Sequence, residues 1–303
     1  MAKKEKIQEM FDSIAPEYDA FNHLTSLGAD RIWRRRALRE ITGPRVLDEA
    51  CGTGDFSIAI AEHLAASDSG NCRRRSQPFA PLPPRSGPAQ KTSANGSSSV
   101  GKTGAFCRRK GAKRTSGLQN GGDLPTKQSW SVTGVDISEG MLEVMRQKVA
   151  ALEWGDPVGA GRTEYPAGSI TAEAGDCCAL RFPDSSFDTV TVAFGVRNFE
   201  DREKALAEVL RVLRPGGRFV MLELGIPRNR LVAWGFKFYF TRIMPLIGGR
   251  MSGNKQAYRY LPVSVLAFPE PKEWTAVMQR AGFREVRHRS LSLGICNLFT
   301  GEK

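Results

Sequence analysis

Short apolar runs alternate along the chain with stretches in which apolar residues recur at the spacing of an amphipathic helix. The apolar runs predict buried strands, and their alternation with helices is typical of an α/β fold with a mostly parallel sheet and helices on both faces. Near the end of the chain, two runs with no helix between them predict a closing antiparallel hairpin. The expected strands, seven in all, lie at residues 45–49, 132–136, 169–174, 189–194, 218–224, 283–288 and 293–300.

Residues 1–44 precede the first strand and have a helical pattern of their own. Aromatic side chains alternate there with Asp and Asn, Pro16 and Gly28 interrupt the pattern, and residues 30–41 predict an amphipathic helix. A helical segment before the first strand has no position in the sheet, so we expect it to pack over the sheet as a lid. We therefore divide the chain into an N-terminal helical lid, residues 1–44, and a sheet domain, residues 45–303.

The sheet domain is interrupted at about residues 67–129 by a segment rich in Ser, Gly, Pro and Arg. Such a composition cannot bury enough apolar area to offset the entropy of ordering, so we expect a disordered insert. The insert also explains the formal net charge of +12. Residues 66–130 contain about 12 Lys and Arg against about 2 Asp and Glu, which leaves only about +2 for the rest of the chain. Nucleic acid is therefore not an expected partner of the fold.

The loop after the first strand carries the first candidate chemistry. Asp48 lies at the strand end, where doubly wound sheets bind their ligands, and Gly52 and Gly54 leave no side chain where a ligand approaches the backbone. A dinucleotide fingerprint would need a third glycine at Ser57. The loop instead suits a ligand with a positive centre and a ribose, of which S-adenosylmethionine is the obvious one. An ordinary strand-to-helix turn is the alternative interpretation.

Acidic and polar residues also follow the next strands. In nucleotide-binding units an acidic residue ends the second strand about 20 residues after the glycines. Asp136 lies 82 residues after Gly54, and removal of the roughly 63-residue insert restores a spacing of about 19. The carboxylate of Asp136 could accept both ribose hydroxyls. Asp176 could accept the adenine amino group, and Arg197 and Asn198 bring a polar pair to the same edge.

Residues 231–240 are densely aromatic, and apolar residues continue to Gly248. Lys237 and Arg242 interrupt this stretch, so it does not predict a membrane span. We expect it to form a hydrophobic substrate wall, a surface that contacts a membrane, or ordinary core packing.

The six cysteines form no C-x-x-C pair and have no His at ligand spacing, so no metal site is predicted. Reduced thiols and the lack of a signal peptide indicate a cytoplasmic protein.

Four sequence blocks agree with one known family: residues 18–28 with Trp33, residues 46–55, residues 194–198, and residues 211–217 continued to Glu223. A further segment, residues 258–264, fits as well. On these blocks the chain resembles the ubiquinone/menaquinone biosynthesis C-methyltransferase family, which includes demethylmenaquinone methyltransferases. The resemblance covers nearly everything except the insert.

The resemblance implies a Rossmann-like class I methyltransferase fold. It implies contacts with S-adenosylmethionine at Thr53, Asp136, Asp176 and Cys177. It also implies methylation of a ring carbon of a polyprenyl quinol, with the conversion of demethylmenaquinol to menaquinol as the preferred reaction.

Within that reaction we expect Arg197 to stabilise the developing phenolate and Asn198 to orient it. Tyr18 would close the lid or relay a proton. A lipid substrate suggests peripheral contact with the inner face of a membrane, and a homo-oligomer is compatible with the sequence. Two alternatives remain: a methyltransferase for another small lipid or phenol, and an RNA-binding protein that works through the basic insert.

Overall fold

The computed structural model describes residues 3–68, 130–152, 168–251 and 255–303, all of which belong to the same structural unit. The predicted insert lies outside these residues from position 69 onward, so its disorder stays a prediction.

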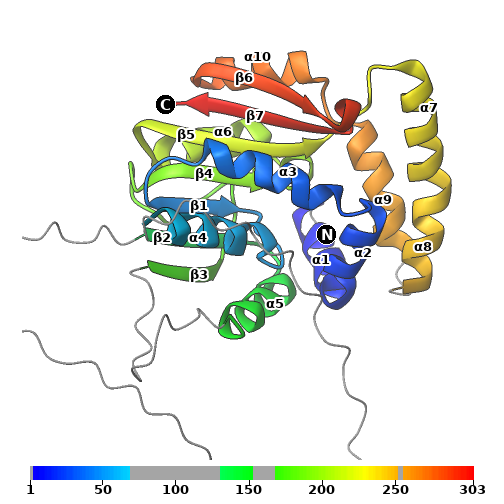
Figure 1. Cartoon of the computed structure of the whole chain (residues 1–303), viewed down its shortest axis with the longest axis horizontal. Coiled ribbons are helices and arrows are strands. Elements are labelled where there is room, and N and C mark those ends of the chain that lie inside the picture. Colours follow the sequence, from blue (N-terminus) through cyan, green and yellow to red (C-terminus); the bar gives the residue numbers. More distant parts are fainter. Residues whose placement is uncertain (1–2, 69–129, 153–167, 252–254) are drawn as a thin grey trace, which may run out of the picture. The chain divides into compact units, whose positions relative to one another are not determined.

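The described residues form a seven-stranded sheet in the order β3-β2-β1-β4-β5-β7-β6. The first five strands of this order are parallel, and β7 is antiparallel to both β5 and β6 (Figure 1). The predicted mostly parallel sheet and its closing hairpin are therefore confirmed. The strands are β1 Arg45–Glu49, β2 Trp130–Asp136, β3 Gly168–Ala174, β4 Phe187–Ala193, β5 Leu213–Leu224, β6 Arg284–Leu291 and β7 Cys296–Glu302.

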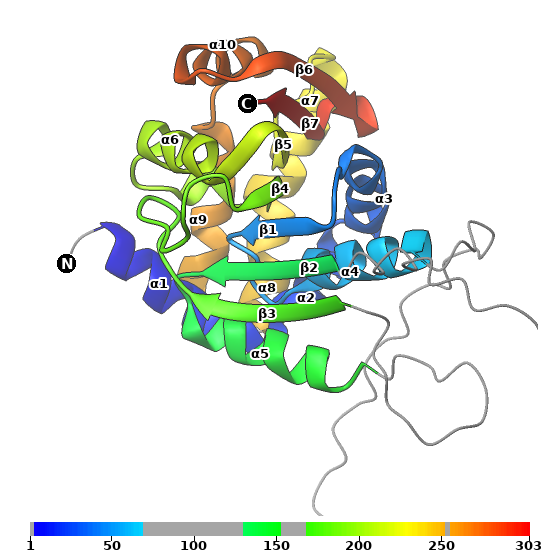
Figure 2. The same ribbon diagram turned by 90° about the vertical axis from the view of Figure 1, so that its left-hand side faces the viewer.

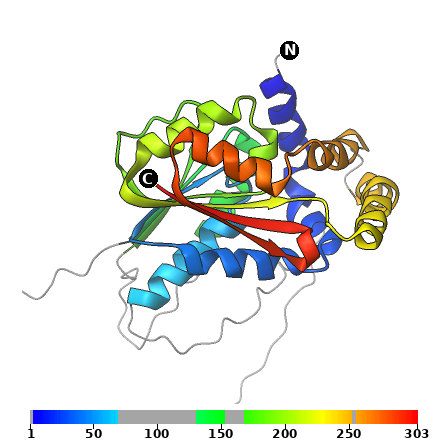
Figure 3. The same cartoon turned by 90° about the horizontal axis from the view of Figure 1, so that it is seen from above.

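Helices cover both faces of this sheet (Figures 2 and 3). Helices α3 and α4 pack on one face, and α6 and α10 pack on the other. The helices are α1 Lys3–Ile14, α2 Tyr18–Thr25, α3 Ala29–Ala37, α4 Asp55–Asp68, α5 Glu139–Ala150, α6 Arg202–Val212, α7 Arg230–Phe238, α8 Met244–Met251, α9 Lys255–Leu266 and α10 Pro271–Ala281.

The alternation of side chains along the central strand explains the two layers. Val46 packs in a cluster with Trp33 of α3, whereas its neighbour Leu47 packs in a second cluster with Trp274 of α10. Successive residues of a strand point to opposite faces, and both faces are buried here. A continuous apolar run therefore supplies both cores.

A third apolar cluster lies beyond the carboxyl ends of the parallel strands. It joins the N-terminal helices to the α7–α9 segment, which is more than 200 positions away in the sequence (Figure 1). Phe21 of α2 is 2 % exposed and belongs to the same cluster as Phe236 and Phe240. The cover over the sheet edge is thus built from both parts of the chain, while α3 packs on the sheet itself.

Most strand boundaries differ from the sequence expectations by a few residues, and two differences change the composition of an element. Strand β5 begins at Leu213, so the Arg-Pro-Gly-Gly segment expected to precede the strand belongs to it. The register shifts there, because Phe187 pairs with Leu213 while Thr189 pairs with Arg218. The predicted helix 30–41 ends as α-helix at Ala37 and continues as a short 3-10 turn.

Candidate active site

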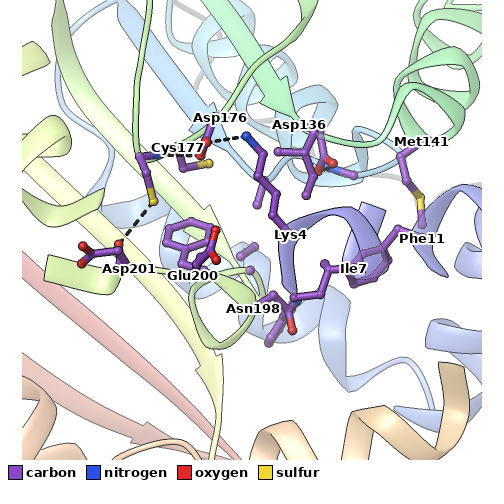
Figure 4. Close-up of a pocket in the computed structure, with 18 of the residues that line it drawn as sticks. Lys4, Ile7, Phe11, Asp136, Met141, Asp176, Cys177, Asn198, Glu200 and Asp201 are labelled. Atoms are coloured by element: carbon purple, nitrogen blue, oxygen red, sulfur yellow. Dashed lines mark hydrogen bonds and ion pairs between the residues drawn. The ribbon is translucent and has the colours of Figure 1, made fainter. Parts of the chain in front are cut away.

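A cavity of about 380 Å³ opens at the carboxyl ends of the strands. Helix α1 contributes Lys4, Ile7 and Phe11 to one side of it, and the strand-end loops contribute the other side (Figure 4). Parallel strands carry their ligands at this edge. Of the residues predicted from the sequence, the cavity is lined by Tyr18, Gly52, Asp136, Asp176, Cys177 and Asn198.

Asp136 ends β2, and its carboxylate is held in place by two backbone donors. The Gly52 N–H donates to Oδ2 and the Ser138 N–H donates to Oδ1, each over 2.9 Å. Ser138 is also the N-cap of α5, with its hydroxyl accepting the Met141 N–H. Burial raises the pKa of Asp136, and the two N–H donors act in the opposite direction. The side chain is therefore oriented before any ligand arrives.

Asp176 follows β3 and faces the N-terminal helix across the cavity. Lys4 Nζ lies 2.5 Å from Asp176 Oδ2, and the Cys178 N–H donates to Oδ1 over 2.9 Å (Figure 4). Burial alone would raise the pKa of Asp176, but Lys4 and this N–H bring it below its usual value. The neighbouring Cys177 is buried, which raises the pKa of its thiol well above the usual range. Its thiol is therefore neutral and lacks the thiolate character of a nucleophile.

Three predicted cofactor contacts, Asp48, Thr53 and Gly54, do not line the cavity. Asp48 is 1 % exposed and accepts hydrogen bonds from the Ser57 and Thr191 hydroxyls, each over 2.6 Å. Burial raises the pKa of Asp48 to about 6. Its side chain points into the layer beneath the loop, because alternate strand residues face opposite sides of the sheet. Asp48 thus ties β1 to α4 and β4.

Thr53 and Gly54 have similar supporting positions. The Thr53 hydroxyl donates to Asp19 of α2 over 2.5 Å. A Cβ at Gly54 would lie 2.4 Å from the Met145 Cγ, so this glycine allows α5 to approach the loop closely. Neither residue lines the cavity.

A second, more apolar cavity of about 510 Å³ lies beside the first. Part of its wall comes from the aromatic segment of α7, including Phe236, and from the residues that follow, Tyr239 and Phe240. Trp33 and Phe194 line it from the sheet side. Residues 231–240 were expected to form a hydrophobic substrate wall, a membrane-contacting surface or core packing. One face of this segment does form the wall of a cavity.

A small cavity of about 40 Å³ lies where the linings of the two larger cavities meet. It shares Tyr18 and Asn198 with the first cavity. It shares Tyr18, Arg197 and Leu261 with the apolar cavity. The three residues predicted to act in catalysis, Tyr18, Arg197 and Asn198, therefore meet at this junction.

Arg197 is 6 % exposed and is paired with the buried carboxylate of Glu223, which was not predicted from the sequence to belong to the site. Its Nη1 lies 2.6 Å from Glu223 Oε1, and its backbone N–H donates to Glu223 Oε2 over 3.1 Å. Nη1 also donates to the Phe194 carbonyl. The Nε of Arg197 has no hydrogen-bond partner among the described residues. The sequence feature that could have identified Glu223 is its position as an acidic residue near the end of the apolar strand β5.

Tyr18 is half-buried at the same junction. Burial raises the pKa of its hydroxyl, and the positive charge of Arg197 acts in the opposite direction. The phenol is therefore neutral near pH 7, and it can donate a hydrogen bond.

Charged contacts hold the N-terminal helices on the elements that support the loop. Lys148 of α5 lies 2.5 Å from Asp19 of α2 and 2.6 Å from Asp55 of α4. Asp12 of α1 accepts the Ser138 hydroxyl over 2.6 Å, next to the carboxylate of Asp136. The cover and the first cavity are thus connected through the same helix, α5.

The fold is shared with solved methyltransferase structures of low sequence identity. A SAM-dependent methyltransferase from Thermotoga maritima, a possible histamine N-methyltransferase, superposes with a TM-score of 0.51 at 14% identity, covering 97% of this chain and 99% of that chain. A putative S-adenosyl-L-methionine-dependent methyltransferase from Methanococcus maripaludis gives 0.50 at 15% identity, covering 97% and 94%. The predicted Rossmann-like class I methyltransferase fold is confirmed.

Sequence comparison extends the likeness over the whole chain. The ubiE/COQ5 methyltransferase family matches residues 1–303. The ubiquinone/menaquinone biosynthesis C-methyltransferase UbiE of Geobacter sulfurreducens is 39% identical, with 99% of this chain and 90% of the relative aligned. The demethylmenaquinone methyltransferase of Deinococcus radiodurans is 36% identical, over 99% and 94%. The predicted methyltransferase class and its methyl donor, S-adenosylmethionine, are confirmed, and the chain belongs to the ubiE/COQ5 methyltransferase family.

Proposed function

We propose that this protein transfers a methyl group from S-adenosylmethionine to a ring carbon of a polyprenyl quinol, and that it converts demethylmenaquinol into menaquinol. The observation that carries this proposal is the junction of a polar cavity with an apolar one at Tyr18, Arg197 and Asn198. A lipid with a polar aromatic head needs both environments. The names of the relatives from Geobacter sulfurreducens and Deinococcus radiodurans support the same substrate class.

The residues of the first cavity fit the cofactor. Asp136 would accept the ribose hydroxyls, because its carboxylate is already oriented at the strand end. Asp176 and Cys177 would contact the adenine, and the Gly52 backbone would lie close to the cofactor. The negative charge of the Asp136 carboxylate also favours the positive charge of the sulfonium group.

The second cavity fits the prenyl chain of the substrate. A volume of about 510 Å³ and an aromatic lining that includes Phe236 and Phe240 are suited to an isoprenoid chain. With the chain there, the quinol ring would lie at the junction, next to Arg197 and Asn198. This arrangement would bring the ring carbon close to the methyl donor and keep water out.

When bound, S-adenosylmethionine supplies the methyl group: the new carbon–carbon bond forms as the S–CH₃ bond breaks, sulfur keeps the bonding electron pair, and the ring carbon then loses its hydrogen as a proton to water, which restores the aromatic ring. Arg197 would favour loss of the neighbouring hydroxyl proton by stabilising the phenolate oxygen, which makes the ring carbon nucleophilic. Glu223 would keep the guanidinium in place. Asn198 would orient the oxygen, and Tyr18 would close the site or pass on a proton.

We also propose peripheral contact with a membrane through the outer face of α7. Leu231, Trp234 and Phe238 are 77%, 68% and 52% exposed, although Phe236 of the same helix lines the apolar cavity. No helix in the described part of the chain is long and apolar enough to cross a bilayer. The stretch 225–247 contains no Asp or Glu, and its basic side chains are exposed: Arg228, Arg230, Lys237 and Arg242. Aromatic and basic residues together suit an anionic lipid surface.

The proposed reaction is tested by incubating the purified protein with S-adenosylmethionine and either demethylmenaquinol or the demethylated ubiquinone precursor. Mass spectrometry should detect one added methyl group on the ring carbon. A panel of other small phenols and lipids serves as the comparison. Methylation of those compounds, without methylation of either quinol, would contradict the proposed substrate class.

The cofactor assignment predicts different results for two carboxylates at the same sheet edge. Asp136→Asn should weaken S-adenosylmethionine binding about 10- to 100-fold, because it loses a charged acceptor for the ribose. Asp48→Asn should lower the melting temperature and leave the affinity of the folded protein unchanged, because Asp48 bonds only to Ser57 and Thr191 in the described structure. Isothermal titration calorimetry measures both affinities. Equal losses of affinity would place Asp48 in the cofactor site.

Arg197→Lys should lower the rate of methyl transfer about a hundredfold while S-adenosylmethionine still binds. Lysine keeps a positive charge beside the buried Glu223, so the carboxylate is not left unpaired. Arg218→Lys is the matched control, because Arg218 pairs with Glu302 of β7 and lines none of the three cavities. The rate of methyl transfer, measured in quenched single-turnover assays, should be lowered in Arg197→Lys and unchanged in Arg218→Lys. An Arg197→Lys protein with the wild-type rate would exclude the proposed role.

If the outer face of α7 contacts a membrane, the protein should bind vesicles that contain anionic phospholipid and should bind neutral vesicles more weakly. The double variant Leu231→Ser, Trp234→Ser should reduce vesicle binding about tenfold or more in a sedimentation assay. Its activity on a short-chain quinol in detergent is the control for folding. If the variant binds vesicles like the wild type, this face is not the contact surface. A change from dimer to monomer would assign the face to a second copy of the chain.

A further inference from the structure

Tyr260 on α9 reaches the junction of the cavities from a segment that is distant in sequence from the other junction residues. It lines the small cavity together with Tyr18, Arg197 and Asn198. Its hydroxyl donates a hydrogen bond to Asn198 Oδ1 over 3.1 Å. Tyr260 is therefore in direct contact with a residue proposed to act on the substrate.

This hydrogen bond determines which end of the Asn198 amide is available. An asparagine amide has an acceptor oxygen on one side and a donating NH₂ group on the other. The Tyr260 hydroxyl occupies the oxygen, so the NH₂ group points in a different direction. Asn198 lies at the junction of the cavities, where the proposed substrate oxygen gains negative charge and only a donor would stabilise it. With the amide reversed, an acceptor would face that oxygen and repel it.

The surroundings of Tyr260 keep its hydroxyl protonated. Burial raises the pKa of Tyr260, and Arg197 and Arg202 act in the opposite direction without reversing the shift. Arg202 lies close because its Nη2 donates to the Arg197 carbonyl over 3.1 Å. Glu223, which also faces this group, supports the neutral phenol. Tyr260 is therefore a hydrogen-bond donor at neutral pH rather than a base.

We propose that Tyr260 is a positioning residue for the methyl transfer, whose hydroxyl holds the Asn198 amide with its NH₂ group toward the ring oxygen of the substrate. This inference rests on the proposed function, because it needs a substrate oxygen that becomes negatively charged at the junction. The hydroxyl acts only through Asn198 and does not exchange a proton with the substrate.

The first test is the variant Tyr260→Phe, which removes the hydroxyl and keeps the ring in place. The single-turnover rate of quinol methylation should fall about tenfold, which corresponds to the loss of one orienting hydrogen bond. The affinity for S-adenosylmethionine should be unchanged, and the rate should keep the pH dependence of the wild type. A shifted pH profile would mean that Tyr260 transfers a proton, which would overturn the positioning role.

A double-mutant cycle with Asn198→Ala shows whether Tyr260 acts through the amide. In the Asn198→Ala protein, adding Tyr260→Phe should cause almost no further loss of rate, because no amide remains to be oriented. Tyr239→Phe is the matched comparison, since Tyr239 bonds the Thr25 carbonyl instead of Asn198. Whatever loss of rate Tyr239→Phe causes, the fold-loss in the double variant with Asn198→Ala should equal the product of the two single fold-losses.

The outcomes separate this inference from the proposed function. If the wild type methylates a quinol but Tyr260→Phe has the wild-type rate, only the positioning role is overturned. The same holds if the effects of Tyr260→Phe and Asn198→Ala multiply independently. If the wild type methylates neither quinol, both proposals are overturned together.

Discussion

Arg197 and Glu223 form an ion pair that is almost completely buried between the ends of β4 and β5. Neither charge could remain in this position alone, because an unpaired buried charge costs several kcal/mol, about 3–5 when one partner is removed. The pair is also the link between fold and chemistry. Glu223 fixes the guanidinium and the backbone of Arg197, and the following residue, Asn198, is thereby placed at the junction of the cavities. Strand β5 thus supports the site from beneath, although none of its residues was predicted to belong to it.

The cover over the sheet edge adds the second constraint. Helices α1 and α2 pack against the α7–α9 segment in a common apolar cluster, so the site is enclosed by two parts of the chain that are distant in sequence. Lys148 and Asp12 connect this cover to α5, whose N-cap follows Asp136. In the proposed function, this connection lets the cofactor cavity and the lipid cavity be closed by the same set of helices. The same helices would then both exclude water from the site and position the substrate.

The sequence predicted Asp136, Asp176 and Asn198 from one rule, that polar residues at the ends of parallel strands meet at one edge. All three line the first cavity, because that rule concerns the backbone direction of the strands. The same rule does not say to which face a strand-end side chain points, and the side chain of Asp48 lies in the buried layer beneath the loop. Ser57 and Thr191 supply hydroxyls on the buried face, and the carboxylate is bonded to them. Glu223 and Tyr260 were not assigned because their partners, Arg197 and Asn198, are far away along the chain.

By itself, the sequence determined the succession of strands and helices, the antiparallel hairpin that closes the sheet, and the edge at which the polar residues gather. These features follow from hydrophobic periodicity and chain direction, which are local properties. Only the tertiary structure decided that the polar and apolar cavities are separate, that they meet at Tyr18, and that Arg197 and Asn198 have fixed partners there. Those features depend on the packing of α2, α7 and α9 around one sheet edge, and no local pattern specifies how three distant segments will pack.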